Sequence, residues 1–237
     1  DNRYGTEHIL GAVNFLRNSG APSYNFETLL RAISGQDGSE HGGWEATDWL
    51  KDKEILIIGS GPGGKRHMAA LQQYINRSKP VVFCLNINDS VPSEIVTAYV
   101  ACHETRILIE ADHYSSLKKP LLMPICRVPD ALLNGLESVE ILDYGLRIQK
   151  GTFMVGSHGC VLSSPLAIAY AMAIVKEAGG KRILLAGFDG YGEGDPRQLE
   201  MIEVLEQYQK MDHAAPLEAV TPTTYPIRKR SIYEPDL

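Results

Sequence analysis

Cysteine is scarce in this sequence of 237 residues: there are four, and no two of them form a C-x-x-C pair. Three of the four lie within apolar runs. The cysteines are Cys84, Cys102, Cys126 and Cys160. This pattern favours buried free thiols in a reducing compartment over disulfides, so we expect a cytoplasmic location.

Long apolar runs and an excess of basic residues are also absent. No stretch approaches the roughly 18 apolar residues of a membrane span, and no signal peptide is recognisable. Acidic residues outnumber basic ones, 29 to 23, and the net charge of -6 argues against nucleic acid as a partner. Because the sequence begins with Asp1 rather than Met, we expect a fragment or a processed form of a longer protein.

The sequence divides into two parts of different character. Residues 6–17 place apolar side chains at helical spacing, and a second short helix is expected at 26–33. The segment 35–43 is rich in glycine and polar residues, which is typical of a linker. We therefore expect residues 1–47 to be a helical appendage with a linker, and residues 48–237 to form the main domain.

The main domain begins with the pattern of a β–α–β unit. An apolar run at 55–58 has the length of a strand buried on both faces, and a glycine-rich break, 59–64, follows it. A helix at 65–77 and a strand at 81–85 complete the unit. Further strands are predicted at 97–102, 121–125, 139–143, 183–188 and 217–220, and further helices at 165–178 and 196–211. This alternation predicts an α/β fold with a doubly wound, mostly parallel sheet in three layers.

The glycine-rich break is the first candidate site. Glycines permit the tight turn and a close approach of the backbone to a ligand, and the turn directs the first amides of the next helix at an anion. Lys65 and Arg66, in the first turn of that helix, suit a phosphate. We predict a phosphate or nucleotide site, and the alternative is a turn without a ligand. The residues are Gly59, Ser60, Gly61, Pro62, Gly63, Gly64 and Arg66.

The kind of nucleotide depends on the end of the second strand. The spacing matches G-x-G-x-x-G, but an NAD site would want an acidic residue there, and the sequence has Asn86 and Asn88. Asp89 could replace that acidic residue, so NAD stays open. The missing G-K-[ST] excludes a P-loop.

Two polar residues follow other predicted strands. His103 could be a general base or a substrate ligand, and a hydrogen-bonded structural role is the alternative. Asp189 could bind a sugar hydroxyl or a cation, or cap the following turn. Neither His113 nor His158 has metal-ligand spacing with another histidine. Asp195 and Pro196 are ordinary helix-start residues.

A polar loop, Thr221–Pro226, follows the last predicted strand. It could contact a ligand, with Arg228, Lys229 and Arg230 close behind to meet phosphate or carboxylate. A solvated basic run is the alternative. Candidate substrate contacts in this loop and in the loop after Asp189 are Thr223, Tyr225 and Tyr191.

The order of these motifs resembles that of the bacterial lipooligosaccharide sialyltransferases, and of related domains that include archaeal 6-hydroxymethylpterin diphosphokinases. The matching segments are Ile57–Pro62, Cys84–Asn86, Ser163–Pro165, Leu185–Tyr191 and Val220–Pro222. The resemblance covers roughly residues 53 to 226 and implies a Rossmann-like nucleotide-binding domain. It implies that Gly59, Gly61, Asn86, Ser163 and Ser164 hold a CMP-type nucleotide. The sialyltransferases place their base between the Gly-x-Asp segment and the last strand, where the one histidine here is His213.

A second resemblance concerns the parent protein. Cys102-His103, Gly187–Tyr191 and Thr221–Pro226 are similar to the C-terminal part of larger bacterial proteins that begin with an aldolase barrel. Those barrels are of the hydroxymethylglutaryl-CoA lyase and 4-hydroxy-2-oxovalerate aldolase type. The parent would then be named a lyase, with the aldolase as a covalently linked partner. Eight βα units do not fit these residues, so we assign them no lyase chemistry.

Three functions are therefore expected in turn. The first is transfer of a 2-keto-3-deoxy sugar from a CMP donor in surface-polysaccharide assembly, with His103 as base and Asp189 on the sugar. The second is a diphosphokinase that binds ATP and Mg²⁺ through Asp89 and Asp189. The third is a non-catalytic module that binds a nucleotide or docks to the aldolase.

Overall fold

The structure is a computed structural model in which residues 38–128 and 133–234 are described. The helices predicted at 6–17 and 26–33 lie outside these residues. Within them, no helix is long and apolar enough to cross a membrane.

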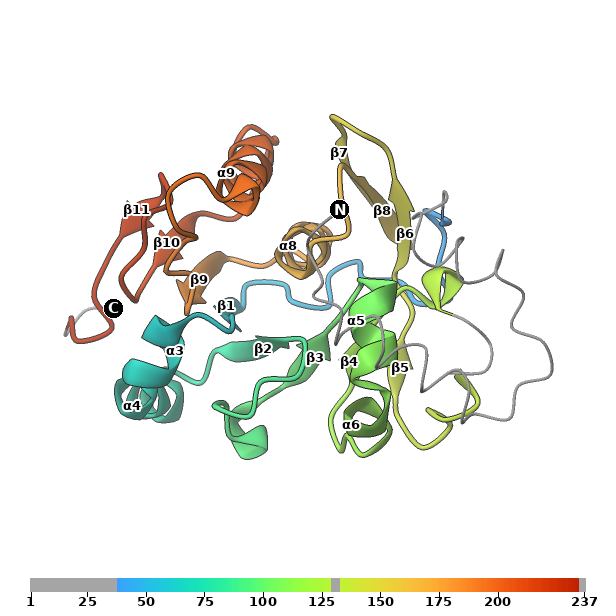
Figure 1. Ribbon diagram of the computed structural model, residues 1–237, viewed down its shortest axis with the longest axis horizontal. Helices are drawn as coiled ribbons and strands as arrows, with labels where there is room; N and C mark the ends of the chain where they lie inside the picture. Colours follow the sequence, from blue (N-terminus) through green and yellow to red (C-terminus); the bar gives the residue numbers. More distant parts are fainter. Residues whose placement is uncertain (1–37, 129–132, 235–237) are drawn as a thin grey trace.

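The main sheet has eight strands in the order β11-β10-β9-β1-β2-β3-β4-β5, and every neighbouring pair is parallel (Figure 1). The strands are β1 (Glu54–Ile58), β2 (Val81–Leu85), β3 (Ala98–Val100), β4 (Leu121–Leu122), β5 (Ile141–Leu142), β9 (Arg182–Ala186), β10 (Leu217–Ala219) and β11 (Arg228–Lys229). The predicted α/β class with a mostly parallel sheet is confirmed.

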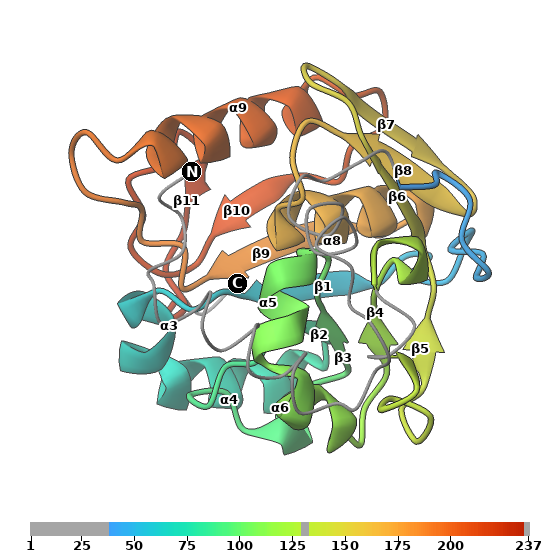
Figure 2. The same ribbon diagram turned by 45° about the vertical axis from the view of Figure 1, so that its right-hand side comes forward.

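The sheet is buried on both faces because its strands alternate between two apolar clusters. Ile55 and Ile57 of β1 belong to one cluster, and Leu56 and Ile58 to the other. Helices α8 (Ala167–Glu177) and α9 (Pro196–Gln209) cover the first face, whereas α4 (Met68–Ser78), α5 (Glu104–Ile109) and α6 (Ala111–Ser115) cover the second. Figures 1 and 2 show these helices on opposite sides of the sheet. The molecule is therefore doubly wound.

Helix α8 is buried all round. Every residue from Ile168 to Val175 is buried, because the helix lies between the main sheet and a small second sheet (Figure 1). A helix that is apolar on every side is expected in such a place. Its bounds are close to the predicted 165–178.

The second sheet was not predicted. It has the order β6-β8-β7, with β6 (Gly145–Ile148) parallel to β8 (Gly159–Leu162) and β7 (Phe153–Gly156) antiparallel to it. The chain that precedes β1 packs along this sheet. The Trp44 amide donates to the Asp143 carbonyl, and the Ala46 amide donates to the Ser157 carbonyl. The described end of the predicted linker is therefore held by backbone hydrogen bonds.

Several other elements differ from expectation. The helix predicted at 65–77 is two helices, α3 (Pro62–Arg66) and α4, which meet at His67. Helices α5 and α6 were not predicted. Two short 3-10 turns, Ser93–Ile95 and Ile125–Arg127, connect strands. Because α3 starts at Pro62, the glycine loop itself supplies the first turn of the helix.

Candidate functional site

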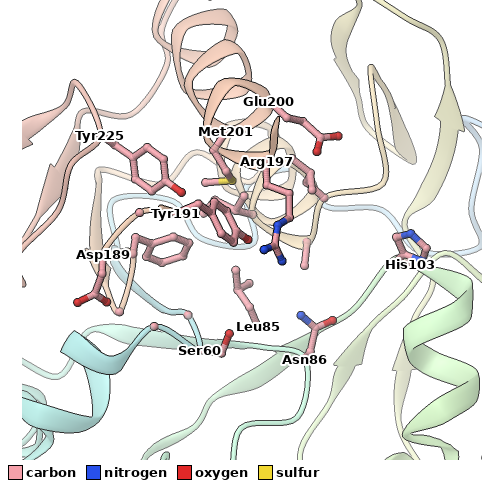
Figure 3. A pocket seen from close by; sticks show the side chains of 18 of the residues that line it. Ser60, Leu85, Asn86, His103, Asp189, Tyr191, Arg197, Glu200, Met201 and Tyr225 are labelled. Carbon is pink, nitrogen blue, oxygen red and sulfur yellow. The ribbon is translucent and has the colours of Figure 1, made fainter. Parts of the chain in front are cut away.

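A cavity of about 440 Å³ lies at the carboxyl edge of the main sheet, where the loops after β1, β2, β3 and β9 converge (Figure 3). Ligands of open parallel sheets bind at this edge. The wall is formed by residues 59–62, the first residues of α8 at 165–168, and residues 187–191. Helix α9 closes one side through Arg197, Glu200 and Met201.

The cavity brings together residues that are far apart in the sequence. The predicted site residues in its wall are Gly59, Ser60, Gly61, Pro62, Asn86, His103, Asp189, Tyr191 and Tyr225. The other predicted site residues do not line it: Gly63, Gly64, Arg66, Asn88, Ser163, Ser164 and Thr223. Their proposed ligand roles stay predictions.

The glycine loop is packed against the chain's own Gly187–Asp189 segment. The Gly63 amide donates to both carboxylate oxygens of Asp189, at 2.9 and 3.0 Å, and the Gly61 amide donates to the Gly187 carbonyl. A Cβ on Gly61 would lie 2.3 Å from Asp189 Oδ2, and one on Gly63 would lie 2.6 Å from Oδ1. The glycines are therefore needed for contact with this segment, whether or not a phosphate binds.

Asp189 fills the place that the sequence suggested for a phosphate. A carboxylate at a helix N-terminus satisfies free amides and complements the helix dipole. Of the remaining loop amides, Gly59 donates to Ala186 and Gly64 donates to Gly61, so Ser60 has the one loop amide without a hydrogen bond in the described chain. The loop therefore offers a ligand little beyond Ser60.

The two asparagines after β2 have different roles. Asn86 has a left-handed backbone, with φ of 55°, and its amide donates to the Val100 carbonyl. Asparagine tolerates this conformation better than most residues do. Asn88 braces the loop, because its side chain donates to the Gly59 carbonyl at 3.1 Å and accepts from the Ser90 amide.

His103 and Asp189 lie at opposite ends of the cavity (Figure 3). They face different parts of any bound molecule, so one reacting atom cannot engage both. The preceding residue, Cys102, is fully buried, and burial is the main cause that raises the pKa of its thiol. A protonated thiol is a poor nucleophile. His103 is thus the histidine that the structure brings to the site.

The first turn of α8 has backbone amides that are not satisfied. Among the described residues, the amides of Ala167, Ile168 and Ala169 donate no hydrogen bond, and the helix has no side-chain cap and no acidic residue in its first turn. Ile168 and Ala169 are buried, at 3% and 1% exposure. Buried backbone amides are nearly always paired with protein, water or a ligand.

The other helices at this edge differ from α8 in this respect. Asp189 accepts from α3, and Asp195 accepts from the Arg197 amide at the start of α9 at 2.9 Å. The start of α8 is therefore the helix terminus at the cavity without a carboxylate of its own. The neighbouring Ser163 hydroxyl donates instead to the Thr152 carbonyl, at 3.3 Å.

Four charged or flexible residues in the wall were missed: Arg106, Arg197, Glu200 and Met201. Asp195 and Pro196 predicted the start of α9, so a residue in its first turn could have been expected at this edge. Arg106 had no comparable signal, because α5 has six residues and was not predicted. Tyr225 is buried at 2% exposure, and burial is the main cause that raises its pKa.

Among the residues that the structure describes, no three or more His, Cys, Asp or Glu side chains are grouped so that they could hold a metal ion. Asp89 is exposed and does not line the cavity. A scan against protein-family models finds no match for the sequence, and a search of curated proteins finds no relative.

Proposed function

We propose that the cavity binds a nucleotide through its phosphate, and that the start of α8 receives this phosphate. The observation that carries the proposal is the set of three unpaired amides, Ala167, Ile168 and Ala169, in or beside the cavity wall. The N-terminus of a helix carries partial positive charge and donors that point along the axis, which suits an anion. The Ser60 amide, in the wall of the same cavity, adds a further donor.

The remainder of the cavity suits the organic part of such a ligand. Leu85 and Phe188 give it apolar surface, and Asn86 and Tyr191 give it polar groups that can select a base or a sugar. Small-molecule sites combine apolar walls with a few polar groups in this way. With the resemblance to sialyltransferases, these features favour a CMP-linked sugar over ATP or NAD.

The proposed reaction is transfer of the sugar to an acceptor hydroxyl. The acceptor oxygen bonds to the anomeric carbon, the bond from that carbon to the phosphate oxygen breaks, and CMP leaves. His103 takes the acceptor proton, and the amides at α8 stabilise the charge that develops on the phosphate. Asp189 is then a positioning residue, since both of its oxygens accept from Gly63.

A thermal-shift panel tests this proposal. CMP, CDP, ATP, NAD and cytidine are compared, each with and without Mg²⁺. CMP and CDP should raise the melting temperature by about 5–10 °C at a hundredfold excess over Kd, because the ligand binds only the folded state. Cytidine should raise it less, because it lacks the phosphate.

His103→Ala serves as the matched variant for the catalytic assignment. It should keep the CMP shift and lose sugar transfer, since the base is placed away from the phosphate. Stabilisation by ATP alone, and only with Mg²⁺, would favour the kinase instead. Binding of CMP without turnover under any acceptor would leave a non-catalytic module.

A further inference from the structure

Arg197 reaches into the centre of the cavity. It is the second residue of α9, and Figure 3 shows its guanidinium above Leu85 and Asn86, beside the ring of Tyr191. The side chain is 47% exposed, so it is open to solvent and to a ligand. A cation in this position sits opposite the loops that follow β1 and β2.

Two contacts hold the guanidinium in place. Its carbon lies 4.3 Å from the centroid of the Tyr191 ring, which is a cation–π contact. Its Nε and Nη2 atoms donate to the Asp195 carboxylate, with Nε distances of 3.0 and 3.1 Å and an Nη2 distance of 2.5 Å. Asp195 is itself fixed as the cap of α9. The arginine is therefore oriented before any ligand arrives.

These contacts leave one edge of the guanidinium open. Asp195 takes the edge formed by Nε and Nη2, and Nη1 has no hydrogen-bond partner in the part of the chain that the structure describes. The open edge, Nη1 with the second hydrogen of Nη2, is a planar fork. Such a fork matches the two oxygens of a carboxylate or a phosphate.

The charges around the fork are mixed. Glu200 lines the same wall, and Asp189 turns its oxygens towards Gly63 and away from the cavity centre (Figure 3). The Asp195 charge is engaged on the opposite edge of the guanidinium. The cavity centre therefore presents the arginine fork and the Asn86 amide to a ligand.

We propose that Arg197 is a specificity-determining residue that binds an oxyanion of the ligand through this fork. The inference deepens the proposed function and rests on it for the identity of the ligand. The oxyanion is either the nucleotide phosphate or a carboxylate of the transferred sugar. The helix-start amides of α8 and the Arg197 fork would then contact different oxygens.

The direct readout does not need a nucleotide. Inorganic phosphate and, separately, pyruvate are titrated while the Nε–Hε resonance of Arg197 is followed by NMR, assigned with Arg197→Gln. The resonance should move and saturate with at least one of the two anions. Arg77 gives the internal control, since its guanidinium carbon lies 5.7 Å from the Tyr74 ring centroid on α4, outside the cavity wall. Its resonance should stay in place.

Binding constants then identify the source of the oxyanion. Arg197→Gln and the control Arg77→Gln are compared for cytidine, CMP and CMP-N-acetylneuraminic acid. Loss of a charged hydrogen-bonded pair should weaken binding about 10- to 100-fold. Weaker binding of both CMP compounds assigns the phosphate, and weaker binding of the sugar nucleotide alone assigns the carboxylate. Arg197→Lys, which keeps the charge without the fork, should recover only part of the affinity.

The outcomes separate the two proposals. If the Arg197 resonance responds to neither anion, or if Arg197→Gln binds every ligand as Arg77→Gln does, the inference is overturned even when CMP binds. An equal loss for cytidine and CMP also overturns it. A response to phosphate or pyruvate with no CMP binding keeps the inference and removes the proposed function.

Discussion

Replacing Gly187 with alanine is expected to lower the free energy of unfolding by about 2–5 kcal/mol and to abolish ligand binding. Gly187 has φ of +73°, which costs an L-residue about 1–2 kcal/mol. A Cβ there would lie 2.6 Å from the Gly59 carbonyl oxygen, and such overpacking costs a further ~1–3 kcal/mol. Urea denaturation measures the loss, and CMP titration measures binding.

Gly192→Ala is the matched control for this variant. Gly192 lies in the loop after Asp189, and a Cβ there meets no atom within 4 Å. This variant should keep the stability and the ligand binding of the parent chain. If Gly187→Ala were as stable as Gly192→Ala, the packing of the β9 loop against the glycine loop would be wrong.

The second large effect is expected at a buried ion pair behind His103. Arg127 Nη2 donates to both oxygens of Glu104 at 3.0 Å, and the two side chains are 2% and 3% exposed. Arg127→Met leaves the Glu104 carboxylate buried without its cation. That loss should cost about 3–5 kcal/mol at neutral pH. The exposed pair Lys210–Glu206 gives the control, and Lys210→Met should cost less than about 1 kcal/mol.

The cost of Arg127→Met should depend on pH. Burial is the largest cause that raises the pKa of Glu104, and Arg127 opposes it, so the variant has a still higher pKa. A carboxyl group with a raised folded-state pKa favours the fold most below its unfolded pKa of about 4.3, and this contribution is lost as pH rises through the folded pKa. The deficit should therefore shrink as pH falls from 8 towards 5, measured by urea denaturation. A deficit that is the same at both pH values would contradict the charged state of Glu104.

This ion pair bears on the site because of its position. Glu104 is the first residue of α5, directly after His103, and Arg127 comes from the turn after β4. The pair therefore ties the end of β3 to the neighbouring strand. Arg127 Nε and Nη1 are buried and unpaired in the described chain, so the pair is not optimised for stability alone.

Much of the main sheet could be predicted because its signals are local. The apolar run of β1, the glycine break and the second apolar strand, β2, all lie within residues 54–85, and the structure has strands at both runs. The outer strands were predicted too long, since the run expected at 139–143 forms a strand only at Ile141–Leu142. Such edge strands take their length from their neighbours.

The second sheet and helix α5 had no local signal of that kind. Strands β6 to β8 are four residues each, and their burial comes from α8 and from the chain before β1. The pattern of a short strand that packs on a buried helix does not alternate in a recognisable way. Tertiary contact decides these elements.

The glycine loop shows why a site is harder to predict than a fold. Its sequence correctly indicated a tight strand-to-helix turn with free amides. The partner of the Gly63 amide, Asp189, is 126 residues away along the chain, so no local pattern could reveal it. The same holds for Arg197, whose contact with Tyr191 and whose direction into the cavity depend on the packing of α9.

The most direct test of this account is an NMR titration of backbone amides with CMP. The amides of Ala167, Ile168 and Ala169 should show the largest changes, because the phosphate is proposed to accept from them. The Gly63 amide should change little, since Asp189 already occupies it. If CMP binds while the α8 amides stay unchanged and Gly63 moves instead, the phosphate lies in the glycine loop and the central claim is wrong.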